Sequence, residues 1–120
     1  MRLQSFPDKH LNMTVIMRSC DMLSAASAGA ADEMGMAILL HMFARASGLI
    51  ANELVVVKNN FHAYDRHVEI IKQIAENPEY PAPKFYLNPE KTDFYSFTED
   101  DFKLIDYKYT KLATKIPVAV

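Results

Sequence analysis

The sequence is poor in residues on which many functional sites depend. Its 120 residues contain one cysteine, three glycines and no tryptophan. A single cysteine excludes an internal disulfide framework and a cysteine-rich zinc site, and it suggests a reducing compartment. Three glycines are too few for a glycine-rich phosphate loop, which excludes nucleotide binding of the P-loop or Rossmann kind.

A charge excess of one sign and long apolar runs are also missing. Thirteen Lys and Arg residues against fifteen Asp and Glu give a formal net charge of −2. With no basic block, we expect no nucleic acid partner. No stretch reaches the ~18 uncharged apolar residues that a membrane span needs, and the first ten residues lack a leader-like apolar core. We therefore expect a cytoplasmic protein without a membrane partner.

The apolar content, in contrast, is sufficient for a core. Half of the residues are hydrophobic, and the length suits a single domain over residues 1–120. The periodicity predicts strands over 11–18, 54–61, 84–87 and 102–109, and helices from 32 or 33 to 47 and over 64–76. The first helix is apolar on nearly its whole circumference, as buried helices are, and Gly48 suits the position just after its end. This order predicts an α+β fold with a mixed β-sheet packed against one long buried helix.

Two short segments carry polar side chains suited to a nucleotide. Arg18 and Ser19, at a predicted strand end, place a guanidinium beside a hydroxyl, a pair that suits a phosphate. His62 and Tyr64 are two residues apart on a strand end, so their side chains point the same way and could bond a sugar hydroxyl. The alternatives are a solvated strand end for the first pair and a buried His and Tyr bonded to backbone for the second.

Other reactive side chains are less informative. Asp21 could accept a hydrogen bond from a ligand or cap its own turn. Cys20 lies between Ser19 and Asp21 and points away from both, which favours a buried structural thiol over a nucleophile. His62 and His67 are five residues apart without a third ligand pattern, so we expect no metal.

Five segments follow one another as they do in thymidylate synthases. They are RSCD at 18–21, AILLHMFA at 37–44, HAYDRH at 62–67, DF at 101–102 and PVAV at 117–120. From about residue 11 to its end, the chain resembles the C-terminal half of that family, which includes the cytidylate hydroxymethylases. The resemblance implies transfer of a one-carbon unit from 5,10-methylenetetrahydrofolate to C5 of a pyrimidine nucleoside monophosphate.

The resemblance also implies roles for the nucleotide-binding residues. Arg18 and Ser19 would hold the 5′-phosphate, and His62 and Tyr64 would bond the ribose 3′-hydroxyl. On the folate side, the resemblance gives contacts with the pterin to Asp21. It places the carboxylate of Val120 in the tail that closes over the folate.

The chain also departs from the family pattern. The family's catalytic cysteine lies before the Arg-Ser motif, at a position that would precede Met1. Cys20 falls on a non-catalytic position inside the motif. We therefore expect no catalytic nucleophile in these residues, and no activity from this chain alone.

A second departure concerns the base. The segment from Met22 to Asp32 is about three residues longer than in the family. Alignment back from Ala37 places Asp32 where thymidylate synthases carry the base-reading Asn. An ionised carboxylate only accepts hydrogen bonds and so matches the exocyclic amine of cytosine, whereas an amide matches uracil. We expect hydroxymethylation of dCMP or CMP rather than a reaction of dUMP, unless Asp32 only caps the helix. Residues 58–60, Lys-Asn-Asn, also replace a Gly-Gly-Asp turn of the family.

Two alternative functions, in which this chain alone does not catalyse a reaction, stay open. The chain could be a non-catalytic nucleotide-binding module, or a subunit completed by a separate N-terminal half. Because family dimers join through a sheet face, we also expect a homodimer. The stripe formed by Leu11, Met13, Val15 and Met17 could supply that face.

Overall fold

A computed structural model describes residues 1–23 and 31–117 of the chain. The strands are β1 (Arg2–Ser5), β2 (His10–Met17), β3 (Cys20–Asp21), β4 (Ile50–Lys58), β5 (Phe61–His62), β6 (Lys84–Leu87) and β7 (Phe102–Ile105). The helices are α1 (Ala31–Ala46) and α2 (Val68–Ala75), with the 3₁₀ turns η2 (Asp65–His67), η3 (Phe94–Ser96) and η4 (Glu99–Asp101). This arrangement confirms the predicted α+β class.

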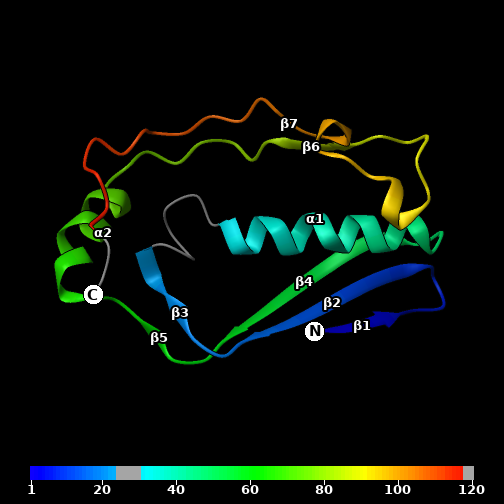
Figure 1. The fold of residues 1–120 in the computed structure, drawn as a ribbon, viewed down its shortest axis with the longest axis horizontal. Helices are drawn as coiled ribbons and strands as arrows, with labels where there is room; N and C mark the ends of the chain where they lie inside the picture. The colour runs from blue at the N-terminus through cyan, green and yellow to red at the C-terminus, as the bar shows by residue number, and fades with distance from the viewer. Residues whose placement is uncertain (24–30, 118–120) are drawn as a thin grey trace.

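The main sheet has the order β1-β2-β4. β1 runs antiparallel to β2, whereas β4 runs parallel to β2 and is connected to it through α1 (Figure 1). A continuous β-branched run such as 54–57 is typical of a central strand, but β4 lies at an edge of the described sheet. β1 was not predicted, because its four residues are all exposed and show no alternation.

The core lies between this sheet and α1. Leu11, Met13 and Val15 on β2 pack against Leu40 and Ala44 of α1, and all five are buried. The alternation predicted for β2 is therefore confirmed. The proposal that this stripe forms an oligomer face is wrong, because α1 covers it within the chain.

α1 ends as the sequence predicted. Gly48 has φ +66°, a conformation that costs glycine little and other residues more. Its N–H donates to the Arg45 carbonyl (3.3 Å), and Leu49 N–H donates to the Ala44 carbonyl (2.8 Å). These two bonds form a Schellman motif, which satisfies carbonyls at the helix end.

β6 and β7 form an antiparallel pair on the side of α1 opposite the main sheet (Figure 1). The helix thus lies between two layers, but of its described side chains only Leu40 and Ala44 are buried and most others are half-buried. A cavity of about 430 Å³ lies between α1, the start of β4 and β6, and His41, Arg45 and Phe85 are among its lining residues. Burial, together with the nearby Arg45 cation, lowers the pKa of His41.

None of the helices in the described part of the chain has the length and apolar character that crossing a bilayer requires.

Candidate functional site

The site forms where the chain leaves the main sheet. β3 follows β2 and β5 follows β4, and the two short strands pair in parallel (Figure 1). Asp21 is opposite His62 in this register, and Cys20 is opposite Phe61. The Arg18-Ser19 segment and the His62-to-Tyr64 segment are thereby brought to the same edge.

Asn60 joins these two segments. Its side-chain Nδ2 donates to Ser19 Oγ at 3.4 Å. Its carbonyl accepts hydrogen bonds from the Cys20 N–H at 3.4 Å and from His62 Nδ1 at 2.8 Å. Because His62 Nδ1 is the donor, the neutral ring keeps Nε2 as an acceptor.

Sequence reasoning did not identify Asn60 as a site residue. Its φ is +43°, in the left-handed region that Asn enters more readily than most residues. An Asn is common where a turn needs a positive φ, so Asn60 could have indicated a turn inside the 54–61 segment. The sequence instead predicted one continuous strand over 54–61. The structure instead ends β4 at Lys58 and starts β5 at Phe61, with the turn that carries Asn60 between them.

Arg18 and Ser19 both lie at an exposed strand end. Within the described residues, no ion pair engages the Arg18 guanidinium. Its charge is therefore available to an anion. The Ser19 hydroxyl accepts from Asn60, and its own proton remains a possible donor.

Tyr64 stands between two histidine rings. Its ring meets His62 edge-on at a centroid distance of 5.3 Å and His67 at 5.6 Å. His62 is half-buried and bonded to backbone, whereas Tyr64 is 42% exposed. The alternative of two buried, backbone-bonded side chains therefore fits neither residue fully: His62 is only half-buried, and Tyr64 is exposed.

His67 lies behind this pair and is 2% exposed. Its Nε2 donates to the Pro117 carbonyl at 2.9 Å. Its Nδ1 is 3.9 Å from Asp21 Oδ1, and the same carboxylate oxygen accepts the Leu23 N–H at 3.1 Å. The predicted turn-capping bond of Asp21 is thus present, and Asp21 is half-buried beside His67.

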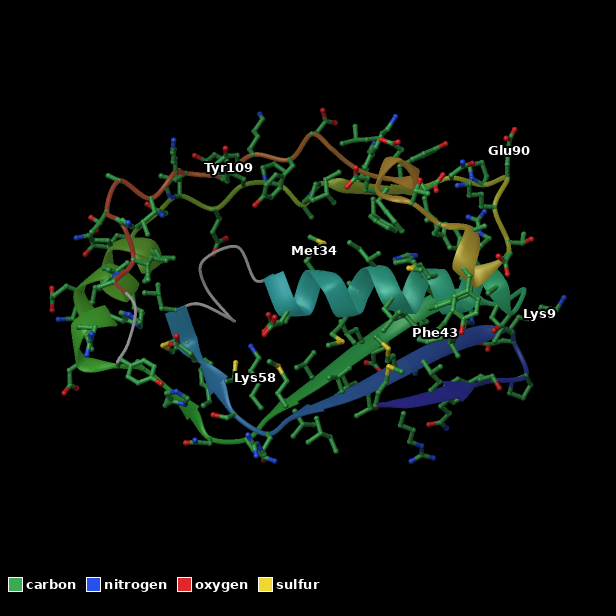
Figure 2. All side chains as sticks on the ribbon, in the orientation of Figure 1. Lys9, Met34, Phe43, Lys58, Glu90 and Tyr109 are labelled. Carbon is green, nitrogen blue, oxygen red and sulfur yellow. The ribbon has the colours of Figure 1, made fainter. Side chains whose placement is uncertain are left out.

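A second charged pair lies beside the site. The Glu33 carboxylate in the first turn of α1 pairs with Lys58 at the end of β4; Lys58 is labelled in Figure 2. The bond with Lys58 lowers the pKa of Glu33 and raises that of Lys58. Lys58 Nζ also lies over the Phe61 ring, 5.2 Å from its centroid. The sequence did not reveal this pair, because its members are far apart in the chain.

Three other sequence predictions can be placed. Asp32 is exposed and is the second residue of α1, so it lies inside the first turn rather than before it. Cys20 is 1% exposed, as expected for a structural thiol. Val120 lies outside the described residues. Among those described, no three His, Cys, Asp or Glu side chains gather as metal ligands do.

Comparison with known proteins now adds to this geometry. The family model for thymidylate synthase matches residues 1–120. The chain belongs to the thymidylate synthase family. It is 40% identical over 82 residues to thymidylate synthase 1 of Bacillus amyloliquefaciens, with 68% of this chain and 36% of that protein covered. It is 43% identical over 86 residues to the thymidylate synthase of Clostridium beijerinckii, covering 70% of this chain and 32% of that one.

A solved relative confirms the fold. The thermostable thymidylate synthase A of Bacillus subtilis superposes with a TM-score of 0.81 at 33% identity, covering 96% of this chain and 40% of that one. The chain thus spans less than half the length of these relatives, and it corresponds to their C-terminal portion.

Proposed function

We propose that this chain supplies the phosphate- and ribose-binding part of a pyrimidine nucleoside monophosphate site. The parent reaction is transfer of a one-carbon unit from 5,10-methylenetetrahydrofolate to C5 of the base. One observation carries the proposal: Asn60 bonds to Ser19 and to the ring of His62, so the two nucleotide-binding segments form one continuous polar edge.

The side chains on this edge suit the two ends of a nucleotide. The exposed Arg18 guanidinium can bond two phosphate oxygens at once, and Ser19 adds a neutral donor. The Nε2 of His62 can accept a hydrogen bond from the ribose 3′-hydroxyl, and the Tyr64 hydroxyl can donate one to the same oxygen.

The folate would lie on the Asp21 side. A half-buried carboxylate accepts hydrogen bonds, and a pterin offers N–H donors, so the chemistry of Asp21 fits the cofactor. We assign Val120 to the same cofactor only by family resemblance. The bound folate would supply the one-carbon unit.

Asp32 is our candidate for reading the base. It is exposed in the first turn of α1. A carboxylate there accepts from the exocyclic amine of cytosine, which favours dCMP or CMP and a hydroxymethyl product. Asp32→Asn should shift the preference toward dUMP.

The nucleophile is the part that this site lacks. In the family the attacking group is a cysteine thiolate that adds to C6 of the base. The one cysteine of the chain, Cys20, is buried within β3, so we expect the thiolate to come from residues other than these 120. The alternative function is a nucleotide-binding module, or a subunit completed by a separate N-terminal half.

Calorimetry with dCMP, dUMP, CMP and deoxycytidine tests the binding proposal. We expect the monophosphates to bind and the nucleoside to bind much more weakly. Arg18→Ala should weaken monophosphate binding by about 10- to 100-fold, the range for a charge-assisted hydrogen bond to phosphate. Arg2→Ala, on exposed β1, is the matched control and should bind normally.

Two results would contradict the proposal. Equal affinity of wild type and Arg18→Ala would remove Arg18 as the phosphate anchor. Normal turnover of dCMP or dUMP by the 120-residue chain with methylenetetrahydrofolate would show that the nucleophile is present after all. Binding without turnover favours the incomplete-site reading.

We further place the protein in the cytoplasm as a homodimer. The single buried thiol suits a reducing compartment. The outward face of the main sheet, rather than the face covered by α1, provides the candidate dimer surface.

A further inference from the structure

The buried His67 connects three parts of the chain that the proposed function treats separately. Its ring contacts Tyr64, its Nε2 bonds to Pro117, and its Nδ1 faces Asp21. Pro117 is 50 residues away in sequence from His67. The contacts of His67 thus join this C-terminal segment to the β3 side of the site.

The partners of the His67 ring determine which of its nitrogens carries a proton. A carbonyl oxygen only accepts, so Nε2 must carry a proton to bond Pro117. The ring is buried, and Nδ1 has no hydrogen-bond partner in the described residues. The 3.9 Å gap to Asp21 is too long for a hydrogen bond, although it allows a charge contact when the ring is protonated. The firm bond of His67 is therefore the one to Pro117.

We propose that His67 is a positioning residue that tethers the C-terminal segment at Pro117 and holds it on the Asp21 side of the site. Without this bond, the Pro117 carbonyl would lose its hydrogen bond to the η2 turn. Any effect of the tether on folate binding rests on the proposed function of Asp21. The hydrogen bond between His67 and Pro117 does not depend on that function.

Limited trypsin digestion of the 120-residue chain measures the tether directly. Lys115 is exposed, and Ile116 and Pro117 follow it. Residues on both sides of a cleaved bond must enter the protease in extended form, so cleavage after Lys115 requires Pro117 to leave His67. Mass spectrometry follows the released peptide 116–120. Cleavage after Lys9, in the turn before β2 at the opposite end of the molecule (Figure 2), is the internal control.

Two substitutions separate the hydrogen bond from the bulk of the ring. The amide nitrogen of a glutamine reaches the place of Nε2, whereas that of an asparagine is too short. His67→Asn should speed cleavage after Lys115 by about tenfold, the equivalent of one lost hydrogen bond, with the Lys9 rate unchanged. His67→Gln should stay near the wild-type rate. His41→Gln, a half-buried histidine on α1, should leave both rates unchanged.

Three results would overturn the proposal. They are a wild-type rate at Lys115 in His67→Asn, a His67→Gln rate as fast as that of His67→Asn, and equal acceleration at Lys9 and Lys115. The last would assign His67 to general stability. Long-range ¹⁵N–¹H spectra of the wild-type chain give a test that needs no variant. They should show a proton on Nε2 of His67, and a bare Nε2 would exclude the bond. Failure of nucleotide binding would leave these results unaffected.

Discussion

At the scale of single residues, the Asp101 carboxylate shows how one buried charge can organise a loop. Its Oδ1 accepts from Asn88 Nδ2 at 2.8 Å. Its Oδ2 accepts from Lys91 Nζ at 2.6 Å and from the Thr98 N–H at 2.7 Å. The bond with Lys91, followed by that with Asn88, holds the pKa of Asp101 far below its ordinary value of 3.8.

This shift makes stability depend on acid pH. A carboxyl whose pKa is lowered in the folded state contributes stability above its unfolded pKa, near 3.8, and loses it as pH falls toward the folded value. Asp101→Asn should lower the unfolding midpoint by about 5 °C at pH 7, and the difference from wild type should shrink below pH 4. Thermal unfolding followed by circular dichroism at several pH values measures this. The exposed neighbour variant Asp100→Asn is the control, and an equal loss in both variants would contradict the role of Asp101.

The Asp101 network was only partly predictable. Thr98 and Asp101 are three residues apart and form a capping box, a local motif that its sequence spacing can reveal. Lys91 and Asn88 lie 10 and 13 residues before Asp101, and no spacing rule connects them to it. The same holds for the site: Arg18, Ser19, His62 and Tyr64 were recognisable as local pairs, whereas the Asn60 bridge depends on how two distant strands meet.

At the scale of elements, two glycines in and next to α1 should respond to substitution by alanine with opposite changes in stability. Gly35 lies inside the helix with open space where a Cβ would be, whereas Gly48 holds the Schellman motif at φ +66°. Gly35→Ala should stabilise the fold by about 0.5–1 kcal/mol, because alanine has the higher helix propensity. Gly48→Ala should destabilise it by about 1 kcal/mol, because alanine disfavours positive φ.

Urea denaturation of both variants under the same conditions provides the comparison. Each glycine is the control for the other, since both variants add one methyl group at an uncrowded position, Gly35 within α1 and Gly48 just after its end. A shift in the same direction for both would show that backbone conformation does not decide the effect.

Elements with an apolar stripe or alternation were predicted, whereas β1 and β5 were not. α1, β2, β6 and α2 have an apolar stripe or alternation that packing uses directly. β1 is wholly exposed, so burial imposes no pattern on it. β5 has two residues, fewer than any periodic signal needs. It exists because β3 offers it a partner, a fact about tertiary structure rather than local sequence.

At the scale of the whole molecule, the chain is less compact than its length suggests. Its radius of gyration is 16.5 Å, whereas a compact domain of this length has about 14 Å. Many large apolar side chains are exposed. Ile16 on β2 is 64% exposed, and Val57, its register partner on β4, is 43% exposed. These two lie on the sheet face opposite α1.

We expect this outward face to form the proposed dimer. Ile16→Glu combined with Val57→Glu should convert the protein to a monomer, because two charges per chain would face each other in a dry interface. Sedimentation velocity gives the mass of each species. Ile105→Glu, the same change at an exposed isoleucine on β7, should leave the assembly intact. A wild-type monomer, or a dimer that survives the double substitution, would exclude this surface.

The parallel pairing that brings Ser19 to Asn60 also has a kinetic consequence. The bond joins residues 41 positions apart, and the chain between them must first pack α1 onto the sheet. Contacts between distant residues carry a large loop-closure entropy and tend to form late in folding. Nucleotide affinity should therefore appear only as folding finishes. In refolding experiments, recovery of binding should lag behind recovery of helix content and report the last step of assembly.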